Sequence, residues 1–204
     1  MVRAPHVDDV VALVTALATG GIRVVELTFT IPRLPELLHT ASENASQTGA
    51  IIGAGTVRGA AQAREAVAAG ARFVVTPGMA DEAADVVHVA HASGAAVILG
   101  AFSPSEVMAA TELGADMVKI FPARAHGPKY LSDLRGPFPE VSFVPSGGID
   151  NGNAADYLAA GAAAVTAGTS VVAPPDVVNG DWAKITDRAT AFCDALRRSP
   201  EKTE

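Results

Sequence analysis

Short apolar runs alternate with amphipathic stretches along almost the whole chain, and glycine stands at the junctions between them. The apolar runs occupy residues 22–27, 50–53, 72–76, 96–99, 117–120 and 163–166. Each follows a glycine, as expected where a helix ends in the left-handed conformation that glycine adopts most easily. Runs this short and this continuously apolar predict strands that are buried on both faces.

The intervening stretches have the periodicity of helices. Val7, Val10, Val14 and Leu17 fall on one helical face, with an aspartate near the start, and residues 34–41, 81–93 and 105–113 predict further helices. Another apolar run, at 143–145, lies between the runs at 117–120 and 163–166. Strands that alternate with helices at intervals of about 20 to 25 residues indicate parallel βαβ units.

Counting a stub at residues 1–3 gives eight strands, the number that closes a (β/α)8 TIM barrel. With 204 residues the barrel would be near-minimal, and we expect residues 1–204 to form one domain. The first strand would be truncated or very short. An open doubly wound sheet is the alternative, but no Gly-x-Gly-x-x-Gly turn follows the first strand to support it.

Composition narrows the classes of function. Hydrophobic residues make up 49% of the chain and charged residues 18%, which excludes a disordered protein. A net charge of -7 predicts no binding to nucleic acid or to an anionic membrane, so any anionic ligand must be held by local groups. A single cysteine, and the lack of an apolar run of transmembrane or signal-peptide length, favour a cytoplasmic protein.

In a barrel of this type, chemistry lies where each strand runs into the loop after it. Polar or glycine-rich positions recur at those ends, and we expect them to meet at one mouth. They are Arg3, Glu26, Thr28, Gly55, Thr56, Thr76, Pro77, Ser103, Lys119, Ser146, Gly147, Gly148, Gly168, Thr169 and Ser170.

Lys119 lies within an apolar segment that continues into Ile120, Phe121 and Pro122. Burial of an ammonium lowers its pKa and leaves a nucleophilic amine of the kind that forms Schiff bases with carbonyl substrates. The alternative is a lysine that extends from the end of a strand into solvent.

Glu26 lies in another apolar run, where a partly buried carboxyl group could transfer protons. The alternative is a carboxylate that only pairs with Lys119 or Arg3.

Two glycine-hydroxyl turns follow the last two predicted strands, at 146–148 and 168–170. Glycine lets backbone amides approach an anion closely, a helix N-terminus behind a turn adds a positive dipole, and phosphate sites in these barrels commonly follow the last two strands. A Gly-Gly turn with no ligand is the alternative for each turn taken alone.

With these residues in place, the chain resembles the 2-keto-3-deoxy-6-phosphogluconate (KDPG) and 4-hydroxy-2-oxoglutarate aldolase family, which includes 2-keto-3-deoxy-6-phosphogalactonate aldolases. The resemblance covers nearly the whole chain. It rests on GGIRVVELT at 20–28, IGAGTV at 52–57, VTPGM at 75–79, KIFPA at 119–123, GPF at 136–138 and PSGGI at 145–149.

The resemblance implies a (β/α)8 class I aldolase, usually trimeric, that cleaves a phosphorylated 2-keto-3-deoxy acid to pyruvate and glyceraldehyde 3-phosphate. It implies no metal or other cofactor. Lys119 matches the Schiff-base lysine and Glu26 the general acid/base, which acts through water. Arg3 and Thr56 match positions near the keto-acid carboxylate; Thr76, Pro77 and Phe121 belong to matching motifs. Ser146, Gly147, Gly148, Gly168, Thr169 and Ser170 match the phosphate-binding turns.

The chain departs from the family pattern at two places. Thr30 stands where many members carry an arginine, and Leu99 stands where others carry proline. Phosphogalactonate-type members also lack the arginine and resemble this chain at residues 127–130, so the resemblance leaves phosphogluconate, phosphogalactonate and 4-hydroxy-2-oxoglutarate open as substrates.

Two other functions remain open on the same fold. A phosphosugar isomerase or epimerase would use the glycine turns and need Lys119 only for its charge. A non-catalytic barrel would bind a keto acid without turnover.

Overall fold

The structure, a computed structural model, describes residues 1–197, and its strands form one parallel sheet of six in chain order. The strands are β1 (Val24–Thr28), β2 (Ile51–Gly55), β3 (Phe73–Val75), β4 (Ala96–Ala101), β5 (Met117–Ile120) and β6 (Phe143–Pro145). All strands therefore end at the same edge of the sheet, as the βαβ pattern predicted.

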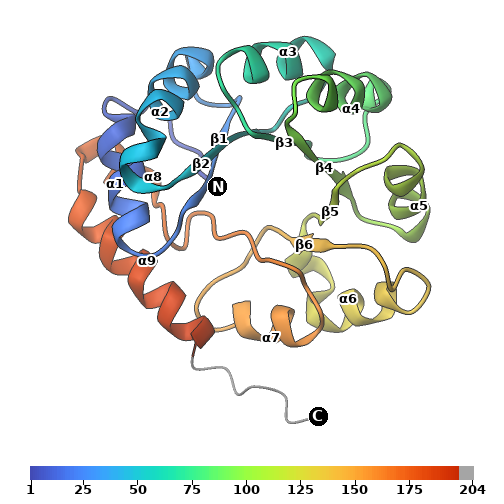
Figure 1. The fold of residues 1–204 in the computed structure, drawn as a ribbon. Coiled ribbons are helices and arrows are strands. Elements are labelled where there is room, and N and C mark those ends of the chain that lie inside the picture. The colour runs from blue at the N-terminus through green and yellow to red at the C-terminus, as the bar shows by residue number, and fades with distance from the viewer. Residues whose placement is uncertain (198–204) are drawn as a thin grey trace.

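The helices lie around the outside of the strands, as Figure 1 shows. They are α1 (Val10–Thr19), α2 (Leu34–Thr48), α3 (Ala60–Ala68), α4 (Ala83–Ala92), α5 (Pro104–Glu112), η1 (Ala123–Ala125), α6 (Gly127–Arg135), α7 (Ala154–Ala159), α8 (Pro174–Asn179) and α9 (Trp182–Arg197). The last helix, α9, packs against the first, α1, so the helical layer comes back to its beginning.

Helix ends follow the local signals in the chain. The Asp9 carboxylate caps α1 by accepting a hydrogen bond from the backbone N–H of Ala12 at 2.8 Å. A glycine with positive φ stands at each of the six predicted helix–strand junctions, for example Gly70 at +93° and Gly161 at +97°. The prediction of glycine-terminated helices is therefore confirmed.

Two segments predicted as strands form only single bridges. Val2 bridges to Leu27 beyond one edge of the sheet, and Thr166 bridges to Ser146 beyond the other. The expectation of a full strand at 163–166 is wrong in this respect. Its neighbour β6 is three residues long and ends in Pro145, which has no N–H to extend the ladder.

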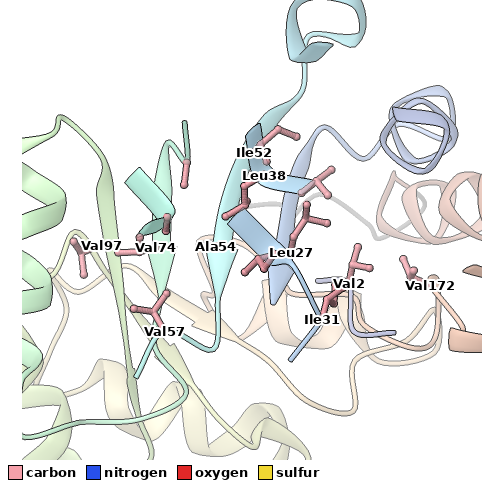
Figure 2. Packing of buried hydrophobic residues seen from close by; sticks show 14 of the residues in the cluster. Val2, Leu27, Ile31, Leu38, Ile52, Ala54, Val57, Val74, Val97 and Val172 are labelled. Carbon is pink, nitrogen blue, oxygen red and sulfur yellow. The ribbon is translucent and has the colours of Figure 1, made fainter. Parts of the chain in front are cut away.

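The two edge segments are joined to each other. The α-amino group of Met1 donates a hydrogen bond to the carbonyl of Ala167 at 2.9 Å. Val2 is fully buried in the main hydrophobic cluster together with Leu27, Ile31 and Val172, and Figure 2 shows these side chains. The N-terminal residues thus connect β1 to the loop after β6.

No helix within residues 1–197 is long and apolar enough to cross a membrane. The predicted domain of residues 1–204 includes 198–204, which lie outside the described residues.

Leu27 provides a test of this packing because its side chain is fully buried between the strands and the helices. Leu27→Ala should lower the free energy of unfolding by roughly 2–5 kcal/mol, from lost apolar burial and the cavity left behind. Urea denaturation measures the change. Met108→Ala, at an exposed position of α5, is the control, and an equal loss there would contradict this account of the core.

Candidate active site

The strands direct Glu26 and Lys119 to the side of the sheet that faces away from the helices. Side chains alternate along a strand, and the neighbours Val25, Val118 and Ile120 lie in the hydrophobic core. Glu26 and Lys119 are each 7% exposed. The structure therefore brings the predicted lysine and carboxylate into the same enclosed interior, from β5 and β1.

Lys119 has the environment of a reactive amine. Its pKa is lowered, chiefly because burial removes the ammonium from water; Glu26 opposes the shift and the positive charge of Arg3 adds to it. Within residues 1–197 no carboxylate forms an ion pair with it. The alternative of a lysine extended into solvent is wrong, because the side chain is buried.

Phe121 contacts both Lys119 and the glycine turn after β6. The Lys119 Nζ lies 5.0 Å from the centre of the Phe121 ring, an arrangement that favours the charged amine. The other side of the ring lies against Gly147, where an added Cβ would come within 3.0 Å of it. Desolvation by burial outweighs the attraction to the ring, so the pKa of Lys119 is lowered.

Glu26 keeps one carboxylate oxygen, Oε1, buried and without a hydrogen-bond partner in the described part of the chain. It forms no ion pair with Lys119 or Arg3 there, so the alternative of a purely structural pair is not supported. A buried acceptor without a partner is costly and usually has a functional explanation.

Gly55 makes room for this carboxylate. A Cβ at Gly55 would lie 1.7 Å from Oε1 of Glu26, so any side chain there would displace the acid. The sequence identified Gly55 only as a strand end. Its role depends on the parallel pairing of β1 with β2, which places Gly55 beside Thr28, two residues after Glu26.

Arg3 and Thr56, predicted near the keto-acid carboxylate, lie together at the mouth. The Arg3 Nη2 is 3.5 Å from the Thr56 hydroxyl. Thr56 has a φ of 56°, in the left-handed region that side chains seldom adopt. Strain of this kind is concentrated at functional sites.

Thr76 and Ser103 have structural partners. The fully buried Thr76 hydroxyl accepts a hydrogen bond from the Gly100 N–H at 2.8 Å, which ties β3 to β4. Pro77 follows it, against Gly100, which has no side chain to obstruct the loop. Ser103 caps α5 in a reciprocal capping box with Glu106. Substrate contacts for Thr76 and Pro77 therefore stay predictions.

The two predicted phosphate turns are adjacent in space. The Ser170 hydroxyl donates a hydrogen bond to the Ile149 carbonyl at 2.8 Å and so fastens the second turn to the first. Within residues 1–197 the backbone N–H groups of Gly148, Thr169 and Ser170 donate to no protein acceptor. Three donors at the turns are thus left without a protein acceptor in the described residues, and an anion site needs such free donors. The helix behind, α7, has only six residues and contributes little dipole.

A cavity of about 620 Å³ reaches Glu26 and Lys119 from the opposite, N-terminal ends of the strands. Its walls are apolar and include Val24, Phe73 and Met117. The polar residues predicted for the site lie at the other end. We therefore assign the chemistry to the C-terminal mouth, where Arg3, Thr56 and the glycine turns lie.

No group of three or more His, Cys, Asp or Glu side chains in the described residues could hold a metal ion.

Comparison with known proteins gives consistent matches over nearly the whole chain. The family model of KDPG and KHG aldolases matches residues 1–188. A 2-dehydro-3-deoxy-phosphogluconate aldolase from Pseudoalteromonas atlantica is 40% identical over 185 residues, which are 90% of this chain and 83% of that relative.

Solved structures give the same result. A native KDPGal structure superposes with a TM-score of 0.86 at 27% identity, covering 97% of this chain and 94% of the other. KDPG aldolase from Legionella pneumophila, with pyruvate captured as a covalent carbinolamine intermediate, has a TM-score of 0.82 at 33% identity and covers 94% and 92% of the two chains.

Burial of Lys119 predicts a gain in stability on its removal. Lys119→Met should raise the free energy of unfolding, because the apolar side chain avoids the desolvation of an ammonium. The pKa of Lys119 is lower in the folded protein than its ordinary value of 10.5, so the unfolded chain binds more protons between the two values. Wild-type stability rises with pH across that interval.

The gain from Lys119→Met should therefore be largest below the folded-state pKa and shrink as the pH approaches 10.5. Urea denaturation at a series of pH values measures it. Lys129→Met, at an exposed lysine of α6, is the control and should change little. A gain that grew with pH would contradict the burial of a strained ammonium.

Proposed function

Because this chain belongs to the KDPG and KHG aldolase family, we propose that it is a class I aldolase that cleaves a 2-keto-3-deoxy-6-phospho sugar acid to pyruvate and glyceraldehyde 3-phosphate. The observation that carries the proposal is the pairing of a buried amine with a lowered pKa and a buried carboxylate oxygen that has no partner. The first supplies a nucleophile and the second a proton acceptor.

The reaction begins at Lys119. The neutral amine attacks the C2 ketone of the substrate to give a carbinolamine, and loss of water leaves an iminium between Nζ and C2. The iminium accepts the electron pair when the C3–C4 bond breaks, so the reaction requires no metal. Protonation of the resulting enamine at C3 and hydrolysis of the imine release pyruvate and restore Lys119.

Glu26 transfers the protons. Its free oxygen Oε1 accepts the C4 hydroxyl proton, through a water molecule, as the C3–C4 bond breaks and the aldehyde forms. Because Glu26 forms no ion pair with Lys119, the carboxylate remains available for this transfer. The carboxylate charge also opposes the fall in the pKa of Lys119, which limits how far the amine is neutralised before substrate binds.

The ends of the substrate bind on opposite sides of the pair. In this proposal Arg3 and Thr56, which lie 3.5 Å apart, bind the keto-acid carboxylate, and Thr76, Pro77 and Phe121 contact the substrate between its ends. The free N–H groups at Gly148, Thr169 and Ser170 would bind the phosphate, and Gly147 and Gly168 let the backbone approach it. Ser146 is buried at the start of the first turn and fixes that turn through its β-bridge to Thr166.

The complete (β/α)8 barrel also belongs to this proposal. Counting residues 1–3 and 163–167 as the first and last strands closes the ring, with support from the bridges at Val2 and Thr166 and the hydrogen bond from Met1 to Ala167. We also propose a single domain over residues 1–204 and a cytoplasmic location, from length and composition, and a homotrimer, from the family resemblance. 4-Hydroxy-2-oxoglutarate is a further candidate substrate.

Borohydride trapping tests the role of Lys119. Reduction in the presence of pyruvate should convert the imine into a stable adduct, and peptide mass mapping should find it at Lys119 alone. Lys119→Arg should abolish the adduct, while Lys129→Arg, at an exposed lysine, should retain it. An adduct elsewhere, or none in the wild-type protein, would refute the Schiff-base assignment and favour an isomerase or a non-catalytic binding protein.

Replacement of the acid tests the role of Glu26. Glu26→Gln should preserve the pyruvate adduct at Lys119 but slow carbon–carbon bond cleavage by roughly 100- to 10,000-fold, the usual contribution of a general acid/base. Gly55→Ala should give a similar loss, because its Cβ would occupy the place of the carboxylate.

Gly53→Ala is the matched control on the same strand. Its Cβ would meet the ring of Phe73 at 2.5 Å instead of Glu26, so it should lower stability with a much smaller effect on cleavage. Unchanged turnover in Glu26→Gln would remove Glu26 from the mechanism.

A further inference from the structure

Arg124 is an exposed cation at the mouth that the proposed mechanism does not use. It lies in η1, three residues after the end of β5, on the same edge of the sheet as the glycine turns. The lysine and arginine side chains in ion pairs within residues 1–197 are Arg33, Lys184, Arg188 and Arg197, so its guanidinium has no carboxylate partner there.

The main chain fixes Arg124 against the turn after β6. The Arg124 N–H donates a hydrogen bond to the carbonyl of Gly147 at 3.0 Å, and the Ala123 N–H donates to Ser146 at 2.8 Å. These two bonds make η1 and the turn one unit. The position of Arg124 relative to Gly148 is therefore set by the backbone rather than by a flexible surface contact.

The aliphatic part of Arg124 lies directly on Gly148. A Cβ at Gly148 would come within 2.6 Å of the Arg124 Cβ and 3.0 Å of its Cδ. Gly148 also has a φ of 85°, so glycine is needed here both for the left-handed backbone conformation and for the space that the Arg124 side chain occupies. The base of the Arg124 side chain is thus fixed against Gly148, whose N–H has no protein acceptor in the described residues.

A formal positive charge would strengthen the binding of a phosphate at these turns, which supply none themselves. The N–H donors of Gly148, Thr169 and Ser170 are neutral, and the chain carries a net charge of -7. A guanidinium donates several hydrogen bonds in a plane that matches phosphate oxygens and stays charged at any physiological pH. Arg124 has this chemistry.

This chain has Thr30 at the position where many family members carry an arginine. The Thr30 hydroxyl lies 2.7 Å from that of Thr28, which in turn donates to the Val2 carbonyl. Thr30 is exposed, its hydroxyl bonds within the described residues only to that of Thr28, and it supplies no charge.

We propose that Arg124 is a specificity-determining residue whose guanidinium binds the substrate phosphate held at the 147–148 and 168–170 turns. This inference rests on the proposed function. It predicts that Arg124 distinguishes phosphorylated from unphosphorylated 2-keto-3-deoxy acids and takes no part in the bond-breaking step.

The test compares two substrates in wild-type protein and in Arg124→Gln. For 2-keto-3-deoxy-6-phosphogluconate, kcat/KM should fall roughly 10- to 100-fold, the usual effect of losing a charge-assisted hydrogen bond, mainly through a higher KM. For the unphosphorylated acid, kcat/KM should stay within about twofold. Arg124→Lys should recover part of the loss.

Controls separate the inference from the proposed function and from misfolding. Lys129→Gln removes one positive charge from an exposed position of α6 and should leave kcat/KM for both substrates unchanged. Inorganic phosphate should inhibit the wild-type enzyme competitively, with a weaker effect on Arg124→Gln. Pyruvate trapping at Lys119 should be equal in both proteins, which shows that the barrel is intact.

Equal losses with both substrates, or no loss with the phosphorylated one, would overturn the role of Arg124 while leaving the aldolase reaction standing. Failure of the wild-type protein to trap pyruvate or to cleave either acid would instead overturn the proposed function, and the inference with it.

Discussion

The site depends on the desolvation of one amine. Lys119 is buried on the inner side of the sheet with no ion pair in the described chain, and burial outweighs the nearby charge of Glu26, so its pKa falls. The same strand offsets the free-energy cost of burying Lys119, because its side chains Val118 and Ile120 pack in the apolar core on the opposite side. A reactive amine at this position therefore requires a well-packed core behind it.

The carboxylate depends on the absence of a side chain. Gly55 leaves the space that Glu26 occupies, and the parallel register of β1 and β2 decides which glycine does so. On the other side of the interior, Phe121 lies between the amine and Gly147. Phe121 thus links the amine to the glycine turn, while the strands β1 and β5 determine the separation of the acid from the amine.

The mouth combines neutral donors with a few placed charges. Arg3 lies beside Thr56 at one side, and Arg124 lies on Gly148 at the other. In a protein with a net charge of -7, these local cations are what would make the mouth attractive to a ligand with a negative group at each end. The N-terminal segment that carries Arg3 also joins β1 to Ala167, so the contacts that link the two edges of the sheet also position Arg3.

Local patterns were enough to predict the parallel strands, the glycine-terminated helices and the burial of Lys119, because each depends on a few consecutive side chains. The sequence analysis missed α6 and α8, which begin at Gly127 and Pro174 and have only nine and six residues. It also overestimated the strand at 163–166, whose pairing depends on Pro145. The missing Glu26–Lys119 ion pair, the space at Gly55 and the position of Arg124 arise between segments far apart in the chain. Register and loop packing determine such contacts, and no local pattern encodes them.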